Sequence, residues 1–146
     1  MSFFMIKARA LNKDDSYTVK VQEMDILLFE RPWSNKTWKT ALSDQNYKVF
    51  ILLDDDKLIG FSVFFIPDQD QQAHLLKIYI SPEYRSKNYS KLLLFPDLPL
   101  KSIYLEVDSK NLRARSFYEK NGLIILGEVK KFYSDGSDAI KMIKYF

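Results

Sequence analysis

The sequence predicts an α/β protein, of the α+β kind, with a central mixed but mostly antiparallel sheet of about seven strands. The first observation is the order of its periodic segments, which alternate as β-α-α-β-β-β-α-β-α-β-β. The second is that short polar turns at residues 54–57 and 134–137 join neighbouring strand-like segments, as hairpins do. Because three strand-like segments follow one another with no helix between them, this order is not a Rossmann repeat.

The N-terminal part is predicted to contain one strand and two helices. Residues 3–10 form the strand, and the first helix runs to about residue 30. Three residues supply N-cap side chains and negative charge at its start: Asp14, Asp15 and Ser16. Four apolar residues at helical spacing form its buried face: Tyr17, Val21, Met24 and Leu28. Pro32 ends this helix, and Ser34 caps a second one that runs through residue 42.

The central part is predicted to hold three strands, at residues 47–53, 58–66 and 73–80. The first two flank the acidic turn of residues 54–57, and a polar loop at residues 67–72 precedes the third. The acidic turn is interpreted as a solvated hairpin, since it lacks the spaced oxygen ligands of a calcium loop.

The C-terminal part begins with a polar, basic segment at residues 81–90. A short helix at residues 92–95 follows, and Pro96 stops it early. After a strand at residues 102–107, Ser109 is the expected cap of a helix at residues 111–121, which Gly122 closes. Residues 123–133 and 138–146 form a closing hairpin.

Composition limits the classes of function. The chain has 146 residues at 17.3 kDa, which predicts one domain over residues 1–146. It has no cysteine and one histidine, His74, which excludes disulfides, a Cys nucleophile and a multi-His zinc site. The N-terminus lacks the pattern of a signal peptide, no apolar stretch is long enough to span a membrane, and a cytoplasmic protein is expected. A net charge of +3 is too small for nucleic acid as the main ligand.

The loop after the third central strand is a candidate anion site. A strand followed by a polar turn and a helix start directs unpaired N–H groups at one point. Arg85, Lys87 and Lys91 place positive charge there. Asn88 tolerates a left-handed backbone better than other non-glycine residues, and Ser90 is small enough for close approach of a ligand. Basic loops of this kind are also common without a ligand.

A second candidate site combines a strand end with the helix that follows it. Glu106 shares a strand face with Tyr104, opposite Leu105. On the helix, Asn111, Ala114 and Tyr118 share one face. Taken singly, each residue has a purely structural explanation: Glu106 as a solvated strand end, Asn111 as a cap and Tyr118 as core.

Two segments together resemble a known family. Residues 76–85 (LKIYISPEYR) resemble the acetyl-CoA motif of the GNAT superfamily of N-acetyltransferases, and residues 111–123 (NLRARSFYEKNGL) resemble its second coenzyme-contacting helix. Other segments are similar to the bacterial ribosomal-protein-alanine N-acetyltransferases, the RimI type: residues 32–37, 105–107, 132–133 and 138–142. The resemblance implies the GNAT fold with helices on both faces of the sheet, acetyl-CoA as co-substrate and no metal.

The resemblance also implies roles for matching residues in binding the coenzyme. Main-chain groups of Ile78, Tyr79 and Ile80 would hold the pantetheine arm like an added strand and polarise the thioester carbonyl. N–H groups of six consecutive residues would bind the pyrophosphate: Arg85, Ser86, Lys87, Asn88, Tyr89 and Ser90. Asn111 would contact the coenzyme.

For the chemistry, the resemblance implies that Glu106 acts as general base through water and that Tyr118 protonates the departing thiolate. Tyr133 would help to hold a peptide N-terminus. The implied activity is acetylation of a protein N-terminal α-amine, and a ribosomal protein is a possible acceptor.

Two other functions stay open. One is a GNAT acetyltransferase for a lysine or small-molecule amine. The other is a non-catalytic GNAT-like module, because the family loop carries glycines where this chain has Asn88 and Ser90. The acceptor, the oligomeric state and the role of His74 are left undecided by the sequence.

Overall fold

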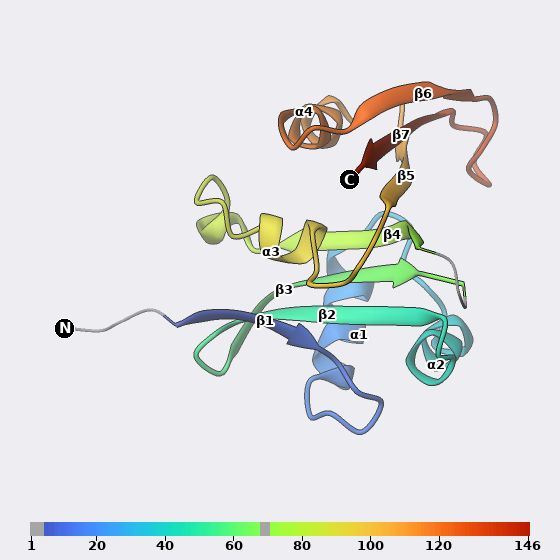
Figure 1. The fold of residues 1–146 in the computed structure, drawn as a ribbon. Helices are drawn as coiled ribbons and strands as arrows, with labels where there is room; N and C mark the ends of the chain where they lie inside the picture. Colours follow the sequence, from blue (N-terminus) through green and yellow to red (C-terminus); the bar gives the residue numbers. More distant parts are fainter. Residues whose placement is uncertain (1–4, 68–70) are drawn as a thin grey trace.

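The computed structural model describes residues 5–67 and 71–146 and contains a seven-stranded sheet (Figure 1). The strand order is β1-β2-β3-β4-β5-β7-β6, and β4 and β5 form the parallel pair in an otherwise antiparallel sheet. This confirms the predicted fold class. The strands are β1 (Ile6–Ala10), β2 (Tyr47–Asp54), β3 (Lys57–Phe65), β4 (Gln72–Ile80), β5 (Ser102–Asp108), β6 (Ile124–Val129) and β7 (Ala139–Tyr145).

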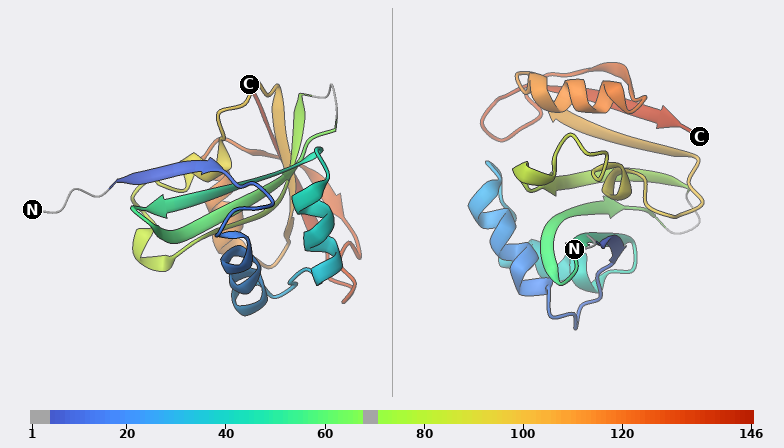
Figure 2. Two further views of the ribbon diagram at one scale, coloured as in Figure 1. Left: turned by 90° about the horizontal axis from the view of Figure 1, so that it is seen from below. Right: turned by 90° about the vertical axis from the view of Figure 1, so that its left-hand side faces the viewer.

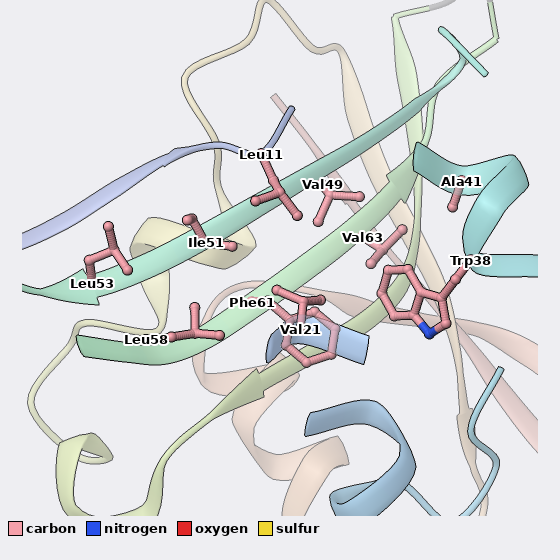
Figure 3. Packing of buried hydrophobic residues seen from close by; sticks show 10 residues of the cluster. All are labelled: Leu11, Val21, Trp38, Ala41, Val49, Ile51, Leu53, Leu58, Phe61 and Val63. Carbon is pink, nitrogen blue, oxygen red and sulfur yellow. The ribbon is translucent and has the colours of Figure 1, made fainter. Parts of the chain in front are cut away.

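Helices lie on both faces of the sheet, as expected. They are α1 (Thr18–Leu28), α2 (Asn35–Ser43), the 3-10 turn η1 (Pro82–Tyr84), α3 (Lys91–Leu94) and α4 (Leu112–Lys120). Val21 of α1 and Trp38 of α2 pack against Ile51 and Phe61 on one face (Figure 3). The opposite face carries the core under α3 and α4, in which Tyr118 packs with its neighbours from β5 and β7. No helix within the described residues has the length and apolar character needed to cross a membrane.

The parallel strands β4 and β5 are paired only at their N-terminal ends. Residues 72–74 pair with residues 102–104, and beyond this point β5 turns away from β4 (Figures 1 and 2). On its other edge β4 pairs with β3, with a bulge at Leu76, because Val63 is opposite Lys77 while Phe64 is opposite Leu75. The C-terminal half of β4 therefore has one edge without a strand partner.

One predicted helix cap is confirmed, and another is replaced by a neighbouring residue. Ser34 caps α2 as predicted, since its hydroxyl accepts from the Thr37 N–H at 3.2 Å. Ser109 does not cap α4; the side chain of Asn111 does, by accepting from the Ala114 N–H at 3.1 Å. Gly122 has a φ of 90° and ends α4 as predicted.

The first helix begins later than predicted, and its buried face differs. Asp15 pairs with Arg9 of β1 and accepts from the Tyr17 N–H. Its carboxylate therefore stabilises the loop before α1 and does not cap the helix. Leu28 is 49% exposed, whereas Asp25 is fully buried one turn after Val21. A charged residue in the core was not expected from the apolar spacing.

Other boundaries also shift. The predicted strand start at Phe3 and part of the loop at residues 67–72 lie outside the described residues. The strand predicted to reach Tyr133 ends at Val129, because Asp138 accepts from the Lys131 N–H at 2.9 Å and Lys131 has a φ of 52°. Tyr133 therefore belongs to the loop between β6 and β7.

Candidate active site

Glu106 lies where β4 and β5 begin to separate. Its side chain is largely buried, and Tyr104 on the same strand face is partly buried, while Leu105 points into the core on the other face. Glu106 Oε2 is 2.5 Å from Nε2 of His74, on β4. The carboxylate therefore has one oxygen engaged by a neighbouring strand, a contact that the sequence did not reveal.

Tyr118 packs against β5 on the face of the sheet opposite Glu106. It is 8% exposed and packs with Leu105 and Val107 of β5. Burial, with a smaller contribution from the charge of Tyr133, raises the pKa of Tyr118. The phenol is therefore protonated throughout the ordinary pH range.

Tyr133, in the β6–β7 loop, is held in place by Arg31 from the connection between α1 and α2. The guanidinium carbon of Arg31 lies 3.8 Å from the centre of the Tyr133 ring. Arg31 also donates to Asp108 at 3.3 Å and to Asp135 at 2.8 Å. Burial raises the pKa of Tyr133, which Arg31 opposes and nearby carboxylates, including Glu106, reinforce. Arg31 thus ties three separate segments together beside the predicted acceptor site.

Main-chain groups at the end of β4 point toward the unpaired edge. The Ser81 N–H donates to the Ile59 carbonyl at 2.7 Å, and alternation along an antiparallel pair then directs the main-chain groups of Tyr79 toward β3. The corresponding groups of Ile78 and Ile80 point away from β3, toward the space beside β5. Of the three residues predicted to hold a pantetheine arm, Ile78 and Ile80 direct main-chain groups to this edge and Tyr79 does not; the Ile80 carbonyl also accepts from Arg85 Nε.

The basic loop after β4 has a sharply turned backbone with unbonded N–H groups. Ser86 has a φ of 64° and Asn88 a φ of 66°, so both are left-handed. Within the described residues, the N–H groups of residues 86–90 have no hydrogen-bond acceptor, whereas that of Arg85 is bonded to the Pro82 carbonyl. These two left-handed residues alternate with residues of negative φ, so the chain turns sharply and the unbonded N–H groups of residues 86–90 lie on this turn. The predicted row of donors therefore starts at Ser86, not at Arg85.

Side chains around this loop fix its position. The Tyr84 hydroxyl donates to Asp54 at 2.5 Å, and this carboxylate raises the pKa of Tyr84 to about 12. Arg85 Nε donates to the Ile80 carbonyl at 2.9 Å, and buried Ser62 donates to the Leu93 carbonyl of α3 at 2.9 Å. Lys87 and Asn88 are exposed, so their charge and backbone are accessible to a ligand.

The left-handed Asn88 leads to a prediction. Asn88→Val should lower acetyl-CoA affinity strongly, because a β-branched residue is a poor fit to a φ of 66°. Asn88→Gly permits the same backbone conformation without steric cost, so it should bind acetyl-CoA about as tightly as wild type. Isothermal titration with acetyl-CoA measures both variants. Equal affinity in wild type, valine and glycine variants would contradict a role for this loop in binding.

Asn111 was expected to contact the coenzyme or only to cap its helix. Its Oδ1 is the N-cap acceptor of α4, and the residue is exposed. The capping role is thus established by the geometry. The amide Nδ2 of an Asn is a donor that capping leaves available, so a contact to a ligand is compatible with the cap.

A buried ion pair fixes the α1–α2 connection against β4. Lys77 Nζ is 2.7 Å from Asp25 Oδ1 and 3.1 Å from the Arg31 carbonyl oxygen. The other Asp25 oxygen accepts from the Trp33 N–H and from Trp38 Nε1, both at 2.8 Å. Burial lowers the pKa of Lys77, and Asp25 opposes that shift.

Breaking this pair should destabilise the protein strongly. Lys77→Met leaves the buried Asp25 without its counter-charge, which costs about 3–5 kcal/mol of unfolding free energy. Lys57→Met is the matched control, since Lys57 is 64% exposed and its loss should cost less than about 0.5 kcal/mol. Urea denaturation measures both, and equal stability of the two variants would show that the pair is unimportant.

No group of three His, Cys, Asp or Glu side chains able to hold a metal occurs within residues 5–67 and 71–146. In the acidic turn between β2 and β3, Asp54 is engaged by Tyr84 instead.

Comparison with known proteins gives a family match. The model of the Acetyltransferase (GNAT) family matches residues 12–123. A Bacillus subtilis (strain 168) protein, provisionally assigned as a ribosomal-protein-bS18-alanine N-acetyltransferase, is 28% identical over 130 residues, which covers 84% of this chain and 85% of that protein.

Solved structures share the fold. The ribosomal-protein-S18-alanine N-acetyltransferase of Escherichia coli superposes with a TM-score of 0.80 at 23% identity, covering 97% of this chain and 94% of the other. NAA60 of Arabidopsis thaliana in complex with acetyl-CoA has a TM-score of 0.82 at 15% identity, with 97% and 99% covered.

Proposed function

This chain belongs to the GNAT family of acetyltransferases, and on that premise we propose that it transfers the acetyl group of acetyl-CoA to the N-terminal α-amine of a protein. The observation that carries the proposal is that Glu106 and Tyr118 lie on opposite faces of β5 beyond the end of its pairing with β4, and that Tyr133 interacts electrostatically with both. This is the arrangement that a base and an acid on the two sides of one reacting carbon would have.

Binding of the donor is assigned to β4 and the loop after it. The main-chain groups of Ile78 and Ile80 act as the edge of a strand toward the pantetheine amides. The free N–H groups of residues 86–90 receive the pyrophosphate, and Lys87 adds positive charge. These features support acetyl-CoA as the donor, in keeping with the complex named for a protein of the same fold.

The reaction is a direct transfer. The amine nitrogen attacks the thioester carbonyl carbon, a C–N bond forms and the C–S bond breaks. Glu106 accepts the ammonium proton through water, and Tyr118 gives its phenolic proton to the departing sulfur. The second proton, which nitrogen loses as the amide forms, restores the Tyr118 phenol, and the proton on Glu106 passes to solvent, so that the products are the amide and the CoA thiol. Since burial raises the pKa of Tyr118, its proton moves together with the departure of sulfur rather than before it.

An α-amine suits this site better than a lysine side chain does. An α-ammonium titrates at about 7.7–8.0, whereas a lysine ammonium titrates at about 10.4. One carboxylate and water therefore suffice to supply free α-amine near neutral pH. Tyr133, fixed by Arg31, forms the wall against which a peptide N-terminus rests. The names of the B. subtilis and E. coli proteins support an N-terminal alanine of a ribosomal protein as acceptor.

The first test is binding of the donor. Acetyl-CoA at one hundred times its dissociation constant should add about 2.7 kcal/mol of stability, which raises the melting midpoint by about 5–10 °C. The Asn88→Val variant is the control and should show little rise. A folded wild-type protein that does not respond would favour the non-catalytic module.

The second test identifies the acceptor class by release of CoA thiol. Three acceptors are compared: a peptide with a free N-terminal alanine, the same peptide N-acetylated with one internal lysine, and spermidine. The proposal expects the first to react fastest at pH 7. Preference for the second or third would instead establish the lysine or small-molecule alternative.

A further inference from the structure

His74 lies beside Glu106, the proposed base, and makes two separate side-chain contacts. Its Nε2 is 2.5 Å from Glu106 Oε2, and its ring stacks on Tyr104 with centroids 4.3 Å apart and planes 12° from parallel. His74 is opposite Tyr104 in the parallel pairing of β4 and β5. Stacking therefore orients the imidazole, and the oriented ring directs one nitrogen at the carboxylate.

The position of this pair in the sheet is also informative. The pairing of β4 with β5 ends at His74, and Glu106 lies two residues beyond the last paired position of β5. The hydrogen bond thus spans the two strands where their main chains no longer meet. The His74–Glu106 hydrogen bond fixes the Glu106 carboxylate relative to β4, the strand proposed to bind acetyl-CoA.

We infer that His74 is a positioning residue for Glu106, an inference that rests on the proposed role of Glu106 as general base. An ionised carboxylate has only acceptors, so Nε2 carries the hydrogen and donates it to Oε2. Oε2 is thereby occupied, and Oε1 is directed at the acceptor amine or its water. The imidazole itself does not contact the reacting atoms.

The charges around the pair are compatible with this role. Lys141 of β7 is opposite Glu106 in the sheet, and its Nζ lies 4.8 Å from the centre of the Tyr104 ring. On the other side, β3 places Phe65 opposite His74. Glu106 thus has a cation on one neighbouring strand and a hydrogen-bond donor on the other.

The test is a double-mutant cycle in the full chain, with acetyl-CoA and the peptide bearing an N-terminal alanine as probes. His74→Phe keeps a ring to stack on Tyr104 but has no donor, and kcat should fall about tenfold with both KM values unchanged. His74→Gln restores an N–H donor and should recover part of the loss. In the Glu106→Gln background, His74→Phe should cause no further fall.

A merely structural role predicts the same fold-loss in both backgrounds, and that result would overturn the inference, as would an unchanged kcat in His74→Phe. If the peptide is not acetylated, the cycle is run with whichever of the lysine peptide and spermidine reacts, so that a wrong acceptor is distinguished from a wrong role for His74.

A measurement without turnover completes the test. Because His74 is the only histidine, its imidazole gives one set of ¹H–¹⁵N signals that needs no assignment. The wild type should show the Nε2-protonated tautomer with a downfield proton, and Glu106→Gln should lose that proton signal or shift it upfield. Identical spectra in the two proteins would refute the contact whatever the acceptor.

Discussion

Replacing Tyr118 with phenylalanine is expected to lower kcat about a hundredfold while leaving the affinity for acetyl-CoA nearly unchanged. Loss of a general acid costs about 10²–10⁴ in rate, and departure of a thiolate needs less help than departure of an amine, which places the effect at the lower end. The phenol is kept protonated by burial, so its proton is available at every pH at which the protein is assayed.

The variant should fold normally, because phenylalanine fills the same place among Leu105 and Val107. Steady-state kinetics gives kcat, titration calorimetry gives acetyl-CoA affinity, and a melting curve confirms folding. Tyr145→Phe is the matched control, since Tyr145 is 64% exposed on β7. Equal kcat in Tyr118→Phe and wild type would remove Tyr118 from the mechanism, and a parallel loss of affinity would make it a binding residue.

Replacing Glu106 with glutamine should slow the reaction about a hundredfold at pH 7 and about tenfold at pH 9, because the free-amine fraction of the acceptor changes by about tenfold over this range. The reason is the charge of the acceptor. An α-ammonium with a pKa of about 7.7–8.0 is mostly charged at pH 7, so it needs a base, whereas at pH 9 most of it is already the free amine. The fall in rate caused by Glu106→Gln is therefore largest below pH 8.

The measurement is kcat/KM for the N-terminal alanine peptide between pH 6 and 9.5 in the variant and in wild type. Glu119→Gln, an exposed carboxylate on α4, is the control and should follow the wild-type profile. A loss that is uniform over this range would mean that Glu106 orients the acceptor rather than accepting its proton.

Local sequence signals were enough for most of the fold. Ser34 and Gly122 act as the predicted start and stop signals, because capping and left-handed termination depend on a few neighbouring residues. Where a side chain had two possible partners, the prediction was wrong: Asp15 pairs with Arg9 on a strand instead of capping α1.

The candidate site was likewise predicted from the sequence only where local signals were sufficient. Alternation along one strand placed Glu106 opposite Leu105, and Asn88 was correctly identified as a residue suited to a left-handed backbone. The contacts that orient these groups join residues far apart in the chain. His74 is 32 residues from Glu106, Lys77 is 52 from Asp25 and Arg31 is 77 from Asp108. No local pattern contains such pairs, so the partners became visible only in the folded structure.

The limited pairing of β4 with β5 divides the sheet into two blocks for amide hydrogen exchange. Strands β1–β4 protect one another, as do β5–β7, while residues 72–74 and 102–104 make the strand-to-strand link between the blocks. Amides of Ile78 and Ile80, which point away from β3, should exchange early, and each block can open with its own free energy. A ligand that bonds to β4 and also contacts β5 or α4 would make the two blocks open together, so that binding changes the cooperativity of unfolding as well as its midpoint.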